Sequence, residues 1–173
     1  MALRLDRRQM SGVNERAHKA AHRTPDYTSS GPGDLSVHRM PGHFIRRLQQ
    51  VAVRLFGDCV GPELTPVQYA ALCAIAQTPG AGQAALAALI GYDRATIGGV
   101  IDRLEQKGWV ARSGSPEDRR LNLLSITPDG QAALARAAPA VLAVQDKLLE
   151  PLDPQEREAF ERMCLKLLAH HLG

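Results

Sequence analysis

Three charged side chains in the second half of the chain, Asp118, Arg119 and Arg120, have the composition of an anion-binding site. Two short runs suited to β-strands flank them, at 109–112 and 122–126, and the residues between include glycine and proline. A guanidinium stays charged and donates through a rigid planar fork that matches a phosphate. A carboxylate two residues before an arginine can hold that fork in one direction. The pattern therefore predicts a β-hairpin with arginines at its tip.

A second set of exposed side chains lies just upstream, on a helix predicted from Arg94 to Lys107. Asp93 can cap its first turn, and Gly108 can end it. Residues spaced i, i+3, i+4 and i+7 must face a core, namely Ile97, Val100, Ile101 and Leu104. The opposite side then presents Arg94, Ala95, Thr96, Gly98, Gly99, Asp102 and Arg103.

This exposed side has the chemistry needed to contact DNA. Arg94 can donate two hydrogen bonds to one guanine, and Thr96 can bond a base or a phosphate. Gly98 and Gly99 each cost about 1 kcal/mol relative to alanine in a helix interior. A reason to keep them is close approach of the backbone, either to DNA or to a packing helix. The candidate DNA contacts are Arg94, Ala95, Thr96, Gly98, Arg103, Asp118, Arg119 and Arg120.

The elements that must position these residues follow from helix start and stop signals. Thr65-Pro66-Val67-Gln68 has the pattern of a capping box, with proline at the first helical position, and opens a helix that ends near Thr78. A short helix is expected at 83–90, stopped by Gly91. Followed by the helix from Arg94 and the hairpin, this order predicts a winged helix–turn–helix, in which the second helix of the pair enters the major groove.

Further helices are expected on both sides of the winged segment. One begins at Pro41 and is expected to end near Gly57, with an apolar face of Phe44, Leu48, Val51, Ala52, Leu55 and Phe56. Another covers 128–149, with a kink expected at Pro139 because proline cannot donate within the helix. The last starts after Asp153 and is expected to bury Phe160, Met163, Cys164, Leu167 and Leu168. The fold class is therefore mainly α with a small β-hairpin wing.

Composition bounds the class of protein. The 173 residues are 45% hydrophobic and 23% charged, which suits one compact soluble domain. No apolar run reaches the length of a membrane span, and no apolar segment follows the first arginines as in a secretory signal. Cys59, Cys73 and Cys164 are odd in number and widely spaced, so we expect reduced thiols that pack as small hydrophobes. These features favour a cytoplasmic protein without a membrane partner.

Charge is distributed unevenly along the chain. Residues 1–57 carry ten Lys or Arg against four Asp or Glu, whereas residues 58–130 carry six against eight. DNA binding must therefore depend on where individual arginines lie rather than on bulk charge. Residues 1–34 are expected to form a basic, flexible arm before a single domain at 35–173. Met1 and Met10 are alternative starts.

Enzymatic signatures are missing from the sequence. It contains neither GxSxG nor a P-loop, has no GxGxxG after a predicted strand, and lacks HExxH. The glycine-rich stretches coincide with loops or with the interior of the helix from Arg94. We therefore expect no enzyme and no cofactor.

The residues from Leu64 to Gly130 resemble the MarR family of bacterial transcriptional regulators. The matching motifs are Leu64–Tyr69, Ile101–Val110, Asp118-x-Arg120 with Leu124-x-Ile126-Thr127-x-x-Gly130, and Gly42–Arg47. The resemblance covers about 38–171 and leaves out the basic arm. Gly98 and Gly99 depart from the Thr/Val-rich sequence that the DNA-contacting helix more commonly has in this family.

The resemblance implies a homodimer that represses transcription from a pseudo-palindromic operator in double-stranded DNA. It places the winged helix–turn–helix at about 62–127 and the dimerisation helices at about 38–57 and 128–171. It also implies release by a small aromatic acid of the benzoate or nicotinate kind, bound between the two regions. The residues expected to bind that ligand are Arg39, His43, Arg46 and Tyr69.

Three alternatives remain open at this point. Cys59, with basic residues such as Arg54 nearby in sequence, could sense oxidants in place of a ligand. Histidines could bind zinc, since His18 and His22 are spaced i, i+4, although no strong zinc signature is present. The acidic balance of residues 58–173 also suits a helical adaptor that binds protein and not DNA.

Overall fold

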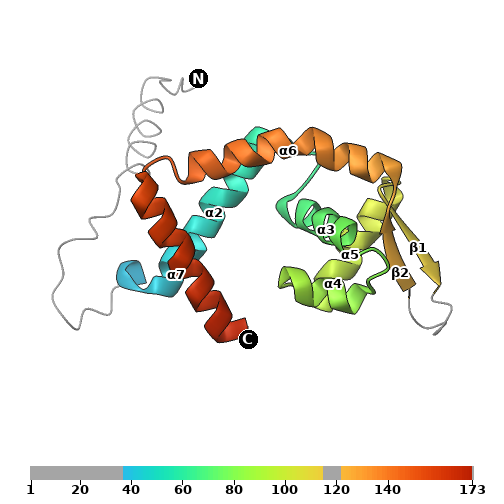
Figure 1. Ribbon diagram of the computed structural model, residues 1–173, viewed down its shortest axis with the longest axis horizontal. Helices are drawn as coiled ribbons and strands as arrows, with labels where there is room; N and C mark the ends of the chain where they lie inside the picture. Colours follow the sequence, from blue (N-terminus) through green and yellow to red (C-terminus); the bar gives the residue numbers. More distant parts are fainter. Residues whose placement is uncertain (1–36, 115–121, 173) are drawn as a thin grey trace, which may run out of the picture. The chain divides into compact units, whose positions relative to one another are not determined.

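The computed structural model describes residues 37–114 and 122–172, and it divides the chain into two units, 1–48 and 49–173. Figure 1 shows the order of the elements. They are η1 (Val37–Arg39), α2 (Pro41–Val60), α3 (Pro66–Gln77), α4 (Gln83–Ile90), α5 (Arg94–Gln106), β1 (Val110–Gly114), β2 (Asn122–Ile126), α6 (Pro128–Leu148) and α7 (Pro154–Leu172). The proposed arm at 1–34 lies outside the described residues.

The helix start and stop signals within the winged segment are confirmed. The hydroxyl oxygen of Thr65 accepts from the Gln68 backbone N–H at 3.3 Å, and the Gln68 side chain accepts from the Thr65 N–H at 3.1 Å. This reciprocal pair is the capping box expected at the start of α3. Gly91 ends α4 with a φ of 70°, and Gly108 follows α5 with a φ of 71°, a left-handed conformation that glycine adopts without steric cost.

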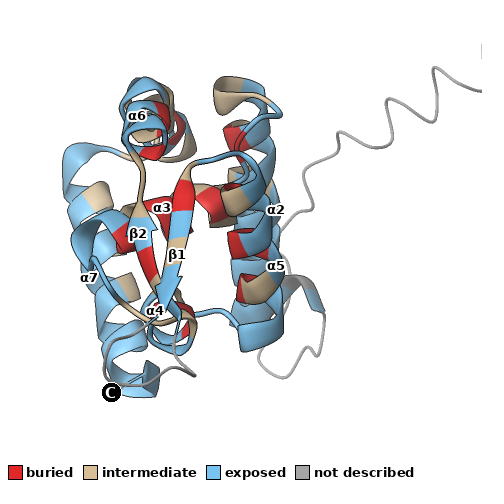
Figure 2. Ribbon diagram, turned by 90° about the vertical axis from the view of Figure 1, so that its right-hand side faces the viewer, coloured by how far each residue is buried: buried red, intermediate tan, exposed pale blue. Residues whose placement is uncertain are grey.

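The core of the winged segment lies where α3, α4 and α5 pack together and against the hairpin. Figure 2 shows the buried residues of these elements on their facing sides. All four residues predicted for the inner face of α5 are at most 4% exposed. The residues that form this core are Leu64, Ala71, Leu72, Ala74, Ile75, Leu86, Ala87, Ile97, Val100, Ile101, Leu104, Val110 and Leu124.

The predicted hairpin is present, and its second strand is hydrogen-bonded to the loop before α4. β1 and β2 pair antiparallel, with Val110 opposite Ile126 and Gly114 opposite Asn122, so β1 runs two residues beyond the expected end at 112. The loop before α4 bonds to β2, since the Gly80 N–H donates to the Leu124 carbonyl at 2.9 Å. These bonds fix the hairpin against the helix–turn–helix.

The hairpin is also held close to the start of α6. The Thr127 hydroxyl donates to the Gly108 carbonyl at 2.6 Å and accepts from the Gly130 N–H at 3.1 Å. A Cβ at Gly130 would lie 2.2 Å from the Trp109 carbonyl oxygen, so only glycine fits there. α6 continues through Pro139, and the kink expected there stays a prediction.

Two expectations about the outer helices are wrong. α2 does not end near Gly57 but continues to Val60, and the chain leaves the helix at Gly61, whose φ is 88°. Gly57 lowers helix propensity but supplies no left-handed turn, so it does not stop the helix. α7 buries none of its residues, although five were expected to be core. The apolar side of α7 lacks a covering element among the described residues.

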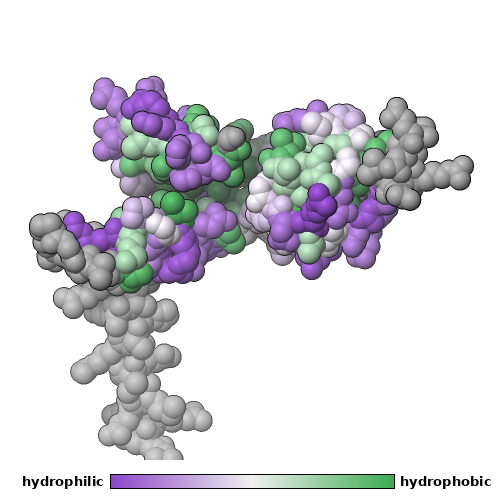
Figure 3. Space-filling view, turned by 90° about the horizontal axis from the view of Figure 1, so that it is seen from below, coloured by the Kyte–Doolittle hydropathy of each residue, from purple (hydrophilic) through white to green (hydrophobic). Residues whose placement is uncertain are grey.

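Apolar side chains are correspondingly exposed on the outer helices. Within α2 only Phe56 is buried, while Phe44 and Leu48 of its predicted apolar face are exposed. Figure 3 shows hydrophobic residues at the surface among hydrophilic ones. In the described part of the chain no single helix is long and apolar enough to cross a membrane; α4 and α5 meet the criterion only together, as a pair bent by 109°.

Candidate nucleic-acid interface and ligand pocket

The start of α5, the expected reader helix, is fixed by Asp93. One carboxylate oxygen accepts from the Thr96 backbone N–H at 2.8 Å, and the other accepts from the Thr96 hydroxyl at 2.5 Å. These hydrogen bonds, that from the hydroxyl foremost, hold the pKa of Asp93 below its usual value. Because the hydroxyl proton of Thr96 points to Asp93, its oxygen is left to accept a hydrogen bond from a ligand.

The outer side of α5 presents the predicted contact residues to solvent. Arg94, Ala95, Thr96 and Arg103 are all exposed, whereas the inner side of the helix is buried. A helix whose inner side is buried in the core and whose outer side is exposed can place side chains against base edges in the major groove. The contacts themselves remain predictions.

The two glycines of α5 have different physical roles. A Cβ at Gly98 would lie 3.0 Å from the side-chain nitrogen of Gln83, which donates to the Arg94 carbonyl at 3.2 Å. Gly98 thus gives room to a link between α4 and α5, a packing role. A Cβ at Gly99 would meet nothing within 4 Å. Nothing described within the protein accounts for Gly99.

Sequence reasoning missed a charged cluster at the base of the hairpin. The Arg112 guanidinium on β1 donates to Glu105 at 2.6 Å and to Asp102 at 2.5 Å, and both carboxylates belong to α5. The i, i+3 spacing of the acids was visible in the sequence, but the direction in which β1 leaves α5 was not. The expected brace within Asp118, Arg119 and Arg120 lies outside the described residues.

A small cavity lies between the second half of α2, the start of α3 and the end of α6. Its volume is about 220 Å³, below the roughly 300–1,000 Å³ of sites for drug-sized ligands, so it suits a single ring. Phe56 and Tyr69 line it with their rings 6.2 Å apart and tilted by 59°. The remaining lining residues are Gln49, Ala52, Val53, Pro66, Val141, Val144, Gln145 and Leu148.

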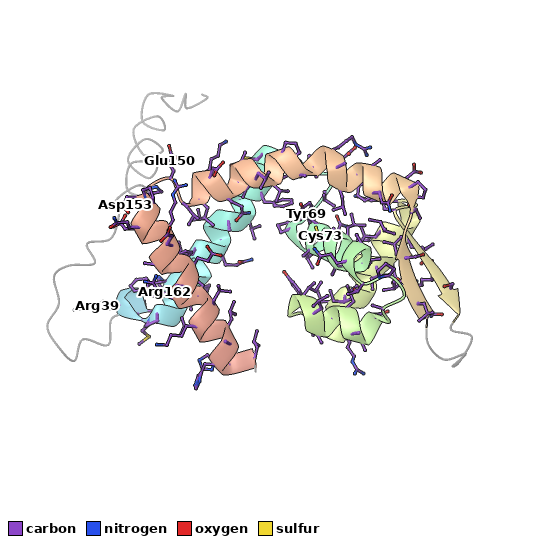
Figure 4. All side chains as sticks on the ribbon, viewed as in Figure 1. Arg39, Tyr69, Cys73, Glu150, Asp153 and Arg162 are labelled. Carbon is purple, nitrogen blue, oxygen red and sulfur yellow. The ribbon has the colours of Figure 1, made fainter. Side chains whose placement is uncertain are left out.

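Tyr69 is therefore the one predicted ligand residue that lines this cavity. Burial, together with a hydrogen bond to the Cys73 thiol one turn along α3, raises its pKa, so the phenol is neutral at physiological pH. Figure 4 shows Tyr69 and Cys73 on the same helix. A neutral phenol beside an aromatic ring can stack on a ligand ring and hydrogen-bond to its substituent.

The other three predicted ligand residues, Arg39, His43 and Arg46, belong to the unit 1–48. Within that unit an Arg46 guanidinium nitrogen lies 3.4 Å from Nδ1 of His43, one turn earlier in α2. The two side chains form a basic pair of the kind that binds carboxylates. Their role toward a ligand remains a prediction.

Residues of the alternative sensors are placed as follows. The Cys59 sulfur accepts from Nζ of Lys147 at 3.4 Å, so its basic neighbour comes from α6. The described residues include no cluster of three or more His, Cys, Asp or Glu able to hold a metal ion. His18 and His22 lie outside the described residues.

Three helices, a core between them and an antiparallel hairpin after the exposed reader helix define a winged helix–turn–helix protein. The model of the MarR family matches residues 64–121. The putative regulatory protein for the hcr operon of Thauera aromatica is 39% identical over 127 residues, which cover 72% of this chain and 73% of that protein. The chain belongs to the MarR family.

Other family members share nearly their whole length with the chain. The transcriptional repressor NicR of Pseudomonas putida is 30% identical over 144 residues, 81% of this chain and 91% of NicR. PcaV of Streptomyces coelicolor, solved with its natural ligand, superposes with a TM-score of 0.74 at 31% identity and covers 81% of this chain and 99% of its own.

Two further solved relatives bear on DNA and ligands. The repressor CouR, bound to a 23-mer DNA duplex, has a TM-score of 0.71 at 33% identity and covers 81% of this chain and 99% of its own. BpsR of Bordetella bronchiseptica, whose DNA binding is regulated by 6-hydroxynicotinic acid, has a TM-score of 0.69 at 32% identity. The match covers 73% of this chain and 96% of BpsR. The protein is a DNA-binding transcriptional regulator, in a family with ligand-responsive members.

Proposed function

We propose that the protein is a repressor that leaves a pseudo-palindromic operator when a small aromatic carboxylate binds. The observation that carries this proposal is the combination of an exposed, capped reader helix with a ring-sized cavity lined by Phe56 and Tyr69. Its DNA contacts would be Arg94, Ala95, Thr96, Gly98, Arg103, Asp118, Arg119 and Arg120. NicR, a repressor, and CouR, bound to DNA, support the role.

A homodimer would supply two such reader helices. Apolar residues of α7, spaced i, i+4, i+5 and i+9, spread over about half of the helix circumference, and each is at least half exposed: Met163, Leu167, Leu168 and Leu172. A face of this kind in a soluble regulator is best covered by a second copy, since a two-fold pair of readers matches two half-sites.

The ligand would place its ring against Phe56 and Tyr69. Arg39, His43 and Arg46 are the residues predicted from sequence to bind a carboxylate, and their basic character supports that role. BpsR, regulated by 6-hydroxynicotinic acid, supports an aromatic acid as the class. Release requires that the ligand bind more tightly to an arrangement of the two readers that does not fit the operator.

Fluorescence anisotropy with the promoter next to the protein's own gene tests DNA binding. We expect a Kd in the nanomolar range that rises steeply with salt, because phosphate contacts release counterions. Binding that is absent, or insensitive to salt, would instead support the helical adaptor.

Thermal-shift screening of aromatic acids tests the ligand class. An acid that binds the folded dimer should raise the unfolding temperature, since ligands of the native state stabilise it, and should release the operator at similar concentration. The Tyr69→Phe variant keeps the aromatic ring but loses the hydroxyl. It should weaken the binding only of those acids whose ring substituent hydrogen-bonds to that hydroxyl. A shift with Zn²⁺ and none with any acid would contradict the proposal, as would release by peroxide that Cys59→Ser abolishes.

A further inference from the structure

Arg112 joins the two DNA-binding elements of the winged segment. Its guanidinium, on the first strand of the hairpin, reaches back to two carboxylates on α5, at 2.5 Å to Asp102 and 2.6 Å to Glu105. The acids are three residues apart and so lie on one side of the helix. One arginine therefore spans from wing to reader helix through two separate hydrogen bonds.

This cluster differs from an ordinary surface ion pair. The side chain of Arg112 is 26% exposed, less than the 55% of Asp102 and the 40% of Glu105. Single exposed pairs contribute little, but a planar guanidinium shared by two carboxylates is geometrically specific and belongs to the stronger class. With both ends of its fork engaged, Arg112 is poorly placed to contact a phosphate.

The cluster complements the other attachments of the hairpin. The turn from α5 into β1 is closed where the Trp109 N–H donates to the Leu104 carbonyl at 2.9 Å, and β2 is tied to the loop before α4. Neither of these attachments joins the side chains of β1 to α5. Arg112 adds that direct link, which fixes the angle at which β1 leaves α5.

We infer that Arg112 is a positioning residue for DNA binding, which holds the wing at a fixed angle to the reader helix through Asp102 and Glu105. The inference rests on DNA binding by the two elements together. Affinity then depends on two acidic residues whose charge opposes phosphate. The geometry outweighs that repulsion because wing and reader helix must reach the duplex at the same time.

The double variant Asp102→Ala/Glu105→Ala separates geometry from charge. It makes the DNA-binding segment more positive by two charges, which by itself tightens binding through counterion release. Loss of the Arg112 contacts should instead raise the Kd for the operator, by about tenfold. The control Asp58→Ala/Glu63→Ala adds the same charge at exposed positions outside the cluster and should bind as tightly as wild type or more so.

Variants of Arg112 supply a second readout. Arg112→Ala should raise the Kd about as much as the double variant while the slope of log Kd against log salt stays at the wild-type value, because no phosphate contact is lost. Arg112→Lys should not restore affinity, since an ammonium lacks the two-pronged fork. Circular dichroism and the fluorescence of Trp109, the single tryptophan, should show an intact fold in each variant.

Specific outcomes would overturn the inference. Tighter binding by Asp102→Ala/Glu105→Ala would show that the acids act only by repulsion, and a salt slope reduced by about one in Arg112→Ala would assign Arg112 to a phosphate. Full rescue by Arg112→Lys would show that charge alone suffices. Failure of the wild-type protein to bind would refute the proposed function itself, so the two failures are distinguishable.

Discussion

Few cations remain to hold DNA once the contacts of each are counted. Of the four Lys or Arg described between 58 and 130, Arg112 is shared by two carboxylates and Lys107 donates to the Glu63 carbonyl while its ammonium lies 4.6 Å from the centre of the Trp109 ring. Arg94 and Arg103 are exposed on the reader helix. The sequence predicts Arg119 and Arg120 as two further DNA contacts, so each arginine should matter individually.

Replacing Arg94 and Arg120 separately should distinguish base reading from phosphate contact. Arg94→Ala should make the free energy of binding to the operator less favourable by about 1–3 kcal/mol and relax the preference at one base pair. Arg120→Ala should weaken binding to all sequences and reduce the salt slope by about one. Anisotropy titrations against the operator and a scrambled duplex, each at several salt concentrations, measure both quantities. Equal losses on both duplexes for Arg94→Ala would exclude a base contact.

Gly99→Ala should stabilise the protein and weaken its binding to DNA. The added methyl group meets no protein atom within 4 Å and improves helix propensity, a gain of about 0.5–1 kcal/mol. If DNA approaches the backbone there, the same methyl group should cost at least about tenfold in Kd. Thermal unfolding and anisotropy on one preparation measure the two effects.

Two other glycines provide the controls for Gly99→Ala. Gly57→Ala also adds a methyl group into open space on an exposed part of a helix, so it should raise stability and leave the Kd unchanged. Gly98→Ala must displace the Gln83 side chain and should stabilise less. An unchanged Kd for Gly99→Ala would show that this position is plain solvated surface.

At the scale of elements, the cap of α5 links stability to pH. The pKa of Asp93 is lowered by its bonds from Thr96, so the charged cap contributes fully above the usual Asp pKa and loses its contribution as pH falls through the lowered value. The difference in unfolding temperature, wild type minus Asp93→Asn, should be constant above about pH 5 and should decrease below about pH 4. Asparagine keeps an uncharged cap, so a difference independent of pH would contradict this prediction.

Elements with complete local signals were predictable. Thr65 with Gln68 begins α3, Gly91 ends α4, and Asp93 begins α5, because each signal satisfies backbone groups within a few residues. The end of α2 predicted at Gly57 was wrong, because a glycine with helical φ can lie within a helix, and α2 continues to Val60. The Arg112 cluster was missed, and of the residues that line the cavity only Tyr69 was predicted, because the partners come from distant segments.

At the scale of the whole molecule, the exposed leucines of α7 should control assembly. Leu167→Glu/Leu168→Glu places charge among these apolar residues and should convert the proposed dimer to a monomer, because a charged group buried at an interface loses its hydration. Light scattering after size exclusion measures the mass. Operator affinity should fall by about 100-fold or more, since a monomer contacts one half-site.

The matched control for that variant is Lys166→Glu on the polar side of the same helix. It should stay dimeric and lose little affinity, because its position by helical spacing is opposite the leucines. A dimer that survives Leu167→Glu/Leu168→Glu would place the interface elsewhere. A monomer that binds the operator like wild type would separate assembly from DNA binding.

The hairpin and the reader helix were evident from sequence because their signals are local: caps, left-handed glycines, and the spacing of apolar residues. Those signals determined the winged helix–turn–helix and its family. Only the tertiary structure decided which charges meet, that Gly98 packs on Gln83 while Gly99 faces open space, and that α7 leaves its leucines uncovered. Contacts between distant segments depend on the angles at which elements leave one another, and no short stretch of residues encodes those angles.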